Sequence, residues 1–101
     1  MSAYAALAEP HRRQILDLLR GQERPVGDLV ERLCLSQPGV SKHLRVLREA
    51  GLVRVRVHGR QRLYTLDPRP LAEVDAWLEP YRVFWNERLD ELEHYLEEHP
   101  E

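Results

Sequence analysis

The sequence predicts a mainly α-helical domain with one small β-hairpin. Apolar residues recur at three- and four-residue spacing through most of the chain, which is typical of amphipathic helices that bury one face. Residues 53–66 depart from this spacing, because apolar and polar residues alternate there on both sides of a glycine. We expect one domain over residues 1–101, whose small core would gain from a partner subunit.

The formal net charge of −2 hides three different blocks. Residues 1–41 sum to zero, residues 42–66 sum to +6, and residues 67–101 sum to −8. Such a protein can still bind a polyanion, because salt screens charges that lie more than about 8 to 10 Å apart. The middle block therefore points to a nucleic-acid partner.

Other compositional features narrow the class of protein. The single cysteine, Cys34, excludes an intramolecular disulfide and a multi-cysteine metal site within one chain. Charged residues interrupt the apolar run near the N-terminus, and no stretch approaches the roughly 20 apolar residues of a membrane span. We expect a cytoplasmic protein with no membrane partner.

Residues 2–20 are predicted to form the first two helices. The first is short and alanine-rich, with Tyr4 and Leu7 as its large apolar residues, and Pro10 starts the second. Three basic residues at 11–13 follow, where cations oppose the helix dipole. Two interpretations stay open, namely contact with phosphate or an acidic neighbour, and simple surface exposure.

Residues 26–35 and 36–51 are predicted to form a helix-turn-helix. Ser36 is a suitable N-cap, Pro38 is tolerated in a first turn, and Gly51 ends the second helix. An apolar stripe of Val40, Leu44 and Leu47 would face the core, whereas the opposite face carries Gln37, Ser41, Lys42, Arg45 and Arg48.

This exposed face suits the major groove of DNA. Amide and hydroxyl side chains near the helix N-terminus can bond base edges, and the cations that follow can reach phosphates. An ordinary solvated surface helix is the alternative for this segment alone. The short helix before it and the basic hairpin after it favour DNA binding.

Residues 53–66 are predicted to form a basic hairpin that serves as a wing. Gly59 supplies the positive φ of the turn, and His58, Arg60 and Arg62 place hydrogen-bond donors at or near the tip. The tip would lie along the phosphate backbone or in the adjacent minor groove. The alternative is a solvated edge hairpin whose arginines oppose aggregation.

Residues 70–98 are predicted to form a long helix, kinked or split near residue 80 by Pro80. Its apolar stripe is wider than a domain of this size can cover, so we expect a homodimer formed through the terminal helices. The residues assigned to the dimer interface are Tyr4, Leu7, Leu78, Tyr81, Trp85, Leu89 and Leu92.

Four motifs lie between residues 7 and 66: LAEP at 7–10 with RRQIL at 12–16, LSQPGVSKHL at 35–44, AGLV at 50–53, and Gly59-Arg60 followed by Tyr64 and Leu66. On these residues the chain resembles the ArsR family of small dimeric winged-helix transcription repressors of bacteria and archaea. The resemblance implies operator binding by a homodimer. It implies that Gln37, Ser41 and Lys42 lie nearest the bases, with Arg45, Arg60 and Arg62 nearer the phosphates.

His43 and Ser36 complete the predicted DNA-binding set. His43 resembles a histidine that recurs in the family's recognition helix, and a packing role is as strong an interpretation as a DNA contact. Gly39 departs from the bulkier residue often found there, at a cost in helix propensity of about 1 kcal/mol relative to alanine. It could permit close approach to the duplex.

Many members of the family sense metals, but their ligands do not recur here. The arsenic- and cadmium-type site needs a cysteine cluster, whereas residues 30–34 contain one thiol. Aligning the zinc-type site on Asp75 puts Trp77, Arg88 and Glu91 at the other ligand positions. The sequence therefore resembles a metal-independent branch, with no assigned metal site or cofactor and an unknown effector.

Two further features have a functional and a structural interpretation. The histidines and glutamates of residues 94–99 could bind a metal, but a disordered acidic tail is favoured. Cys34 could be a redox switch, but a small buried hydrophobic residue is favoured.

We conclude from the sequence that the chain is a DNA-binding transcriptional regulator. It would be a homodimeric repressor that occupies an inverted-repeat operator at a promoter, without a recognisable metal-sensing site. The alternative is a winged-helix protein-interaction module that has lost sequence-specific DNA binding. An enzyme built on Cys34 would need an arranged base, an orienting carboxylate and a substrate loop, which we do not find, so no catalytic residues are assigned.

Overall fold

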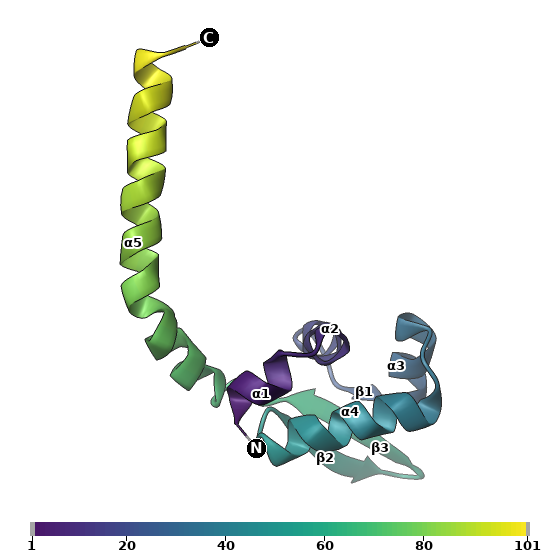
Figure 1. Ribbon diagram of the computed structural model, residues 1–101. Helices are drawn as coiled ribbons and strands as arrows, with labels where there is room; N and C mark the ends of the chain where they lie inside the picture. The colour runs from purple at the N-terminus through teal and green to yellow at the C-terminus, as the bar shows by residue number, and fades with distance from the viewer. Residues whose placement is uncertain (1, 101) are drawn as a thin grey trace.

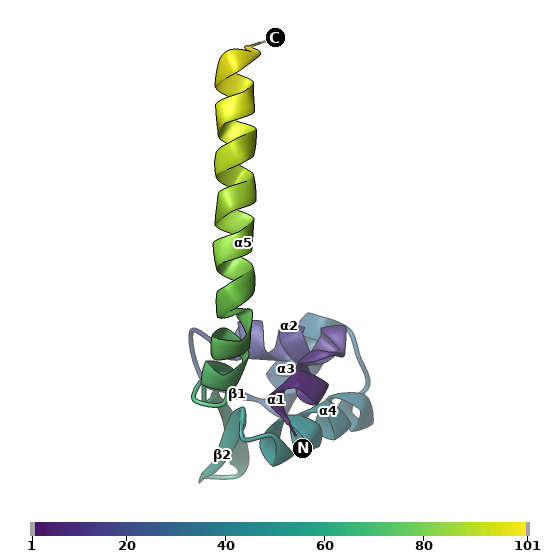
Figure 2. The same ribbon diagram turned by 60° about the vertical axis from the view of Figure 1, so that its left-hand side comes forward.

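The computed structural model describes residues 2–100. It consists of a body of short helices and strands, from which one long helix projects (Figure 1). The described elements in chain order are α1 (Ala3–Leu7), α2 (Pro10–Leu19), β1 (Arg24–Pro25), α3 (Val26–Leu33), α4 (Gln37–Glu49), β2 (Val53–His58), β3 (Gln61–Leu66) and α5 (Leu71–Glu98). Helices α1 to α4 and the sheet form the body, and α5 leaves it (Figure 2).

The hairpin belongs to a three-stranded antiparallel sheet with the order β1-β3-β2. Strands β2 and β3 pair from Val53 opposite Leu66 to His58 opposite Gln61, and Gly59 supplies the turn with φ 63°. The third strand, β1, is an addition to the hairpin that the sequence predicts. Its two residues, paired with Tyr64 and Leu63, are too few for a period-two pattern to be visible.

The core lies between the helices and the sheet. The face of α4 that carries Val40, Leu44 and Leu47 is 0–1% exposed, and Leu29 of α3 and Ile15 of α2 are fully buried beside it. Partly buried residues of β3 and the start of α5 cover the edges of this cluster. The apolar stripe predicted for the second helix of the helix-turn-helix is therefore confirmed.

Two arginines of α2 hold α1 in place. Arg12 donates from Nε to the carbonyl of Ala6 at 2.7 Å and from Nη2 to that of Ala5 at 3.2 Å, and Arg13 donates to the carbonyl of Leu7 at 2.6 Å. These carbonyls lie at the C-terminal end of α1, where a cation is favourable. The basic first turn of α2 thus stabilises the helix before it.

Asp67 joins the end of the sheet to the start of α5. The residue is 8% exposed, and its backbone N–H donates to the carbonyl of Leu52 at 2.8 Å. Its carboxylate accepts hydrogen bonds from Arg54 at 2.9 Å and from Arg69 at 2.7 Å. This junction fixes where α5 leaves the body.

Helix α5 is continuous across Pro80, and its ribbon bends in the part nearest the body (Figure 1). Tyr4 of α1 donates to the carbonyl of Glu73 at 3.0 Å, and its ring lies in a T-shaped arrangement with that of Trp77, with ring centroids 6.2 Å apart. The helix continues to Glu98, so the expectation of a disordered tail is wrong, and His94 and Glu98 pair at 2.9 Å. Helical i, i+4 spacing accounts for this pair.

Helix α5 makes the molecule long, with extents of 62 × 29 × 20 Å. None of its described residues is buried. Over residues 2–100, no helix combines the length and the apolar character that crossing a membrane requires.

Replacing Arg12 by alanine should lower the free energy of unfolding by about 1 to 2 kcal/mol, because two charge-assisted hydrogen bonds to α1 are lost at a partly exposed site. Urea unfolding followed by circular dichroism measures the change. Arg20→Ala, an exposed arginine at the other end of α2, is the control and should shift stability by less than about 0.5 kcal/mol. Equal effects of the two changes would contradict the role given to Arg12.

Candidate nucleic-acid interface

Helix α4 is positioned by its cap and by its buried stripe. Ser36 is the N-cap, and its Oγ accepts a hydrogen bond from the backbone N–H of Gly39 at 3.1 Å, as the sequence predicts. A Cβ at Gly39 would lie 3.1 Å from that Oγ, so glycine there leaves room for the cap. This contact explains why a glycine stands at position 39 without invoking close approach to DNA.

The opposite face of α4 is open to solvent. Ser36, Gln37, Ser41, Lys42, Arg45 and Arg48 are all exposed. Their placement follows from the apolar stripe, because three- and four-residue spacing leaves the intervening positions on the other side of the helix. The structure therefore presents short polar groups followed by cations, in the order that the sequence analysis expected.

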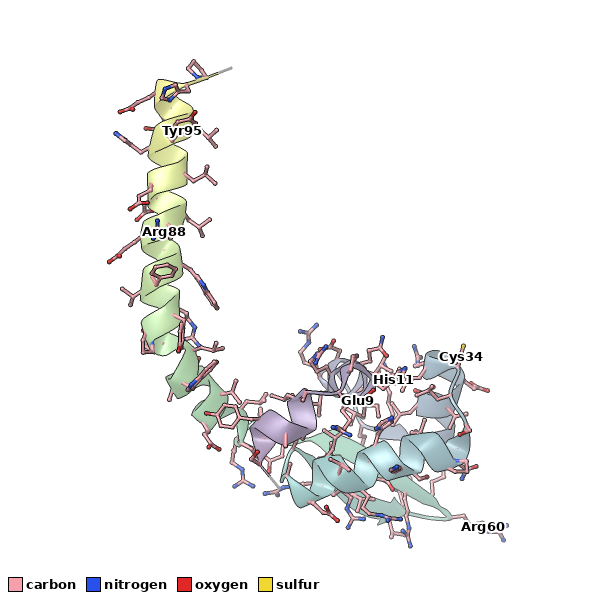
Figure 3. The ribbon with its side chains drawn as sticks, in the orientation of Figure 1. Glu9, His11, Cys34, Arg60, Arg88 and Tyr95 are labelled. Carbon is pink, nitrogen blue, oxygen red and sulfur yellow. The ribbon has the colours of Figure 1, made fainter. Side chains whose placement is uncertain are left out.

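A groove separates the start of α4 from the hairpin. Gln37 and Ser41 line it from α4, and Arg60 and Arg62 line it from the hairpin. Figure 3 shows Arg60 at the hairpin tip, directed away from the body. Four of the predicted DNA-binding residues, which come from two separate motifs, thus surround one surface feature. His58 is exposed in the same hairpin, at the end of β2.

The groove also contains residues that the sequence analysis did not assign. Asp28 and Glu31 of α3 line one side, and Gln61 and Tyr64 of β3 line another. Asp28 is balanced by Arg24 at 2.8 Å and Arg32 at 2.9 Å, and the hydrogen bond from Arg24 is the main cause of its lowered pKa. The sequence offered one indication that Gln61 belongs to the interface, namely its position between Arg60 and Arg62 of the wing.

The basic block of residues 42–66 is only partly available to a ligand. Arg54 bonds Asp67, and Arg56 donates from Nε to Glu23 at 2.9 Å. The hydrogen bond from Arg56 is also the main cause that holds the pKa of Glu23 below its ordinary value. Within residues 2–100, the cations of this block with no carboxylate within 4.0 Å are Lys42, Arg45, Arg48, Arg60 and Arg62.

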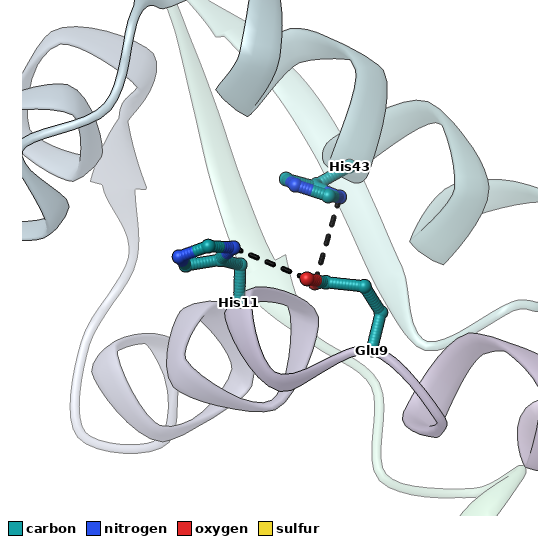
Figure 4. Close-up of side chains that lie close together, drawn as sticks. All are labelled: Glu9, His11 and His43. Carbon is teal, nitrogen blue, oxygen red and sulfur yellow. Dashed lines mark hydrogen bonds and ion pairs between the residues drawn. The ribbon is translucent and has the colours of Figure 1, made fainter.

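His43 lies on a different side of α4 from these cations. Its side chain is 18% exposed and faces α2, with Nδ1 3.9 Å from Glu9 Oε2 and its ring centroid 5.8 Å from that of His11 (Figure 4). The geometry favours the packing interpretation over a DNA contact. Burial is the main cause that lowers the pKa of His43, and the charge of Glu9 opposes it.

Glu9 connects this cluster to the start of α2. Its Oε2 accepts the backbone N–H of Arg12 at 3.1 Å, and its Oε1 lies 3.1 Å from His11 Nδ1. Partial burial acts to raise the pKa of Glu9, but the Arg12 N–H and the two histidines outweigh it and leave the pKa below its ordinary value. In the part of the chain that the structure describes, His43 Nδ1 is buried without a hydrogen-bond partner, which costs about 1 to 3 kcal/mol when nothing compensates it.

Cys34 is exposed, so the favoured interpretation of a buried hydrophobic residue is wrong. The residue ends α3 in the left-handed conformation, with φ 55°, where the chain turns toward α4. This backbone turn carries the side chain away from the buried face of α3, and Figure 3 shows the sulfur at the surface.

The residues assigned to dimerisation fall into two groups. Tyr4 and Leu7 contact their own chain, since Tyr4 bonds α5 and Leu7 packs against the core. Leu78 is partly exposed, whereas the remaining members are exposed on α5: Tyr81, Trp85, Leu89 and Leu92.

Comparisons with known proteins agree with this architecture. Residues 9–55, from the start of α2 into β2, match the family described as "Bacterial regulatory protein, arsR family". The HTH-type transcriptional regulator Rv2034 of Mycobacterium tuberculosis is 41% identical over 87 residues, which cover 86% of this chain and 78% of that protein. The transcriptional repressor SdpR of Bacillus subtilis is 32% identical over 77 residues, covering 76% and 86%.

A solved structure shares the fold. The homodimeric winged helix-turn-helix DNA-binding domain Mb0332 from Mycobacterium bovis, described as a possible ArsR-family transcriptional regulator, superposes with a TM-score of 0.63 at 31% identity, over 77% of this chain and 72% of that chain. Fold, family match and relatives lead to one conclusion. The chain belongs to the ArsR family and is a transcriptional regulator with a DNA-binding winged helix-turn-helix.

Proposed function

We propose that the protein is a homodimeric repressor that occupies an inverted-repeat operator at a promoter. The observation that carries this proposal is the groove between α4 and the hairpin, which is lined by Gln37, Ser41, Arg60 and Arg62. Amide, hydroxyl and guanidinium donors are the groups that bond base edges and phosphates. Among residues 2–100, no carboxylate lies within 4.0 Å of the groove cations Arg60 and Arg62, so a polyanion that binds them would break no ion pair of theirs.

In this proposal α4 enters the major groove with its N-terminal residues toward the bases. Gln37, Ser41 and Lys42 would read base edges, while Arg45 and the hairpin arginines would contact phosphates. Ser36 and His58 would lie at the edge of the contact. We retain His43 as a packing residue, because it faces α2.

A second copy of the chain is the proposed partner of α5. Trp85 is 50% exposed and Leu89 is 61% exposed, and water-exposed apolar residues continue along the helix to Leu96. A contiguous apolar face of this length is typical of an oligomer interface. The related Mycobacterium bovis domain is homodimeric, and the relative SdpR is a repressor.

Two-fold symmetry would set the form of the operator. Two α4 helices related by the dimer axis require an inverted repeat, with half-sites about 34 to 36 Å apart or at a multiple of that distance. Occupying such a site over a promoter would block transcription.

We propose that neither of the family's two metal sites named above operates here. Cys34 is a single exposed thiol, Trp77 is in aromatic contact with Tyr4 and Tyr81, and the guanidinium of Arg88 lies 5.0 Å from the ring centre of Phe84. Indole and guanidinium groups are not metal ligands, so the donor sets of both sites are incomplete.

Fluorescence anisotropy against the DNA upstream of the protein's own gene tests the proposal. We expect saturable binding that exceeds binding to a scrambled duplex and weakens as salt is raised. Equal, weak binding to both duplexes would instead favour a protein-interaction module.

Replacing Lys42 or Arg62 by alanine should weaken operator binding and lower the salt slope, because each phosphate contact contributes about 0.9 to the slope of log affinity against log salt. Anisotropy titrations at several salt concentrations measure both quantities. Arg56→Gln is the matched control in the same hairpin, since Glu23 already balances that charge. A slope lowered as much by the control would show that net charge, and not these contacts, governs binding.

Replacing Trp85 by glutamate should weaken dimerisation at least about tenfold, because a charge would be buried in the apolar interface. Sedimentation equilibrium measures the monomer–dimer constant. Asn86→Glu adds the same charge one residue along, on the polar side of α5 with Arg82 and Asp90, and should leave the dimer intact. A stable Trp85→Glu dimer would remove this face of α5 from the interface.

A further inference from the structure

Glu9, His11 and His43 form a cluster where α2 begins against α4 (Figure 4). One nitrogen or oxygen atom from each residue lies within 4.8 Å of the other two. The closest approaches to the carboxylate are 3.1 Å from His11 Nδ1 and 3.9 Å from His43 Nδ1. DNA binding, as proposed above, makes no use of these atoms.

Within the described chain, one buried nitrogen atom of the cluster makes no hydrogen bond. Among residues 2–100, His43 Nδ1 is buried and has no hydrogen-bond partner, although it points toward the carboxylate of Glu9. The guanidinium of neighbouring Arg12 is bound to the carbonyls of α1. In the tautomer that carries its proton on Nε2, the Nδ1 lone pair of His43 is directed into this polar cluster and is available to a ligand.

The donor set has the composition of a transition-metal site. Two imidazoles and one carboxylate suit Zn²⁺ and similar ions, whereas Mg²⁺ and Ca²⁺ prefer oxygen ligands alone. Bonds of about 2.1 Å in tetrahedral geometry separate ligand atoms by about 3.4 Å. The separations of 3.1 Å from His11 Nδ1 to Glu9 Oε1 and of 3.9 Å from His43 Nδ1 to Glu9 Oε2 bracket this value, although they run to different oxygens of the carboxylate. Rotations of these side chains would bring one ligand atom from each residue to this spacing, starting from atoms that lie within 4.8 Å of one another.

The surroundings allow an ion to enter and be held. The side chains of His11 and Glu9 are 43% and 32% exposed, which gives access from solvent, while His43 closes the inner side at 18%. Glu9 Oε2 is already oriented by the N–H of Arg12, the type of outer contact that fixes a metal-binding carboxylate.

We propose that Glu9, His11 and His43 bind one divalent first-row transition-metal ion, with Zn²⁺ as the representative, and that water occupies the remaining coordination position. The site bridges the start of α2 and the middle of α4. It shares no residue with the positions that correspond to the family's arsenic- and cadmium-type site or to its zinc-type site. Metal binding stands independently of the proposed function, whereas any effect of the ion on operator affinity rests on it.

Cobalt(II) titration of the untagged full-length protein tests the proposal, because Co²⁺ in a tetrahedral site absorbs visible light and Zn²⁺ does not. We expect absorption that saturates at one Co²⁺ per chain and is abolished by added Zn²⁺. His11→Ala, a change at a half-exposed position, should weaken binding at least about tenfold, since loss of even an outer-shell partner costs 10- to 100-fold. His94→Ala is the matched control, because it removes an exposed histidine that is paired to a glutamate elsewhere.

Further variants separate loss of a ligand from loss of the fold. Glu9→Gln keeps an oxygen to cap α2 and should weaken Co²⁺ binding at least about tenfold, and His43→Gln should do the same. Zn²⁺ should raise the Tm of the wild-type protein but not that of His11→Ala, because an ion that binds only the folded state stabilises it. These readouts need no DNA, so a failed operator assay leaves them unaffected.

Three results would overturn the proposal. One is the absence of Co²⁺ absorption with the wild-type protein, and another is equal affinity of the wild-type and His11→Ala proteins. The third is loss of the signal in His94→Ala alone, which would place the ion on α5.

Discussion

Burial of one face of α4 is the constraint on which the rest of the structure depends. Val40, Leu44 and Leu47 are removed from water almost completely, and burying a branched apolar side chain contributes about 1.5 to 3 kcal/mol. Rotating α4 about its axis would expose these residues, so its orientation is fixed. The polar face is consequently held outward next to the hairpin, and His43 is held against α2. One packing arrangement therefore sets both the groove between α4 and the hairpin and the cluster at Glu9.

The elements whose signals are local were predictable from the sequence. The N-cap at Ser36, the buried stripe of α4 and the alternation in β2 each depend on residues a few positions apart. Strand β1 and the contacts of Arg12 with α1 depend on residues brought together by the fold. The exposure of Cys34 follows from a left-handed backbone conformation at a non-glycine residue, which no residue type predicts.

The candidate site was predictable to the same extent. Gln37, Ser41, Arg60 and Arg62 follow from two motifs, and the structure brings them around one groove. Which cations are free was not predictable, because the partner of Arg56 lies 33 residues away and that of Arg54 lies 13 residues away. A charge sum over a segment overstates the charge available to a ligand whenever such tertiary ion pairs form.

In the proposed dimer, helix α5 would link the association of two chains to the placement of α4. It leaves the body at a junction made by Asp67 with its two arginines and by Tyr4 against Trp77. In a dimer built on α5, the distance between the two α4 helices depends on the direction that this junction imposes. The same α1 that carries Tyr4 is held by Arg12, and the backbone N–H of Arg12 is bound by Glu9. The junction at the start of α5 and the Glu9 cluster are therefore joined by a short chain of direct contacts. In the proposed dimer, this chain would connect the cluster to the junction that sets the spacing of the two α4 helices.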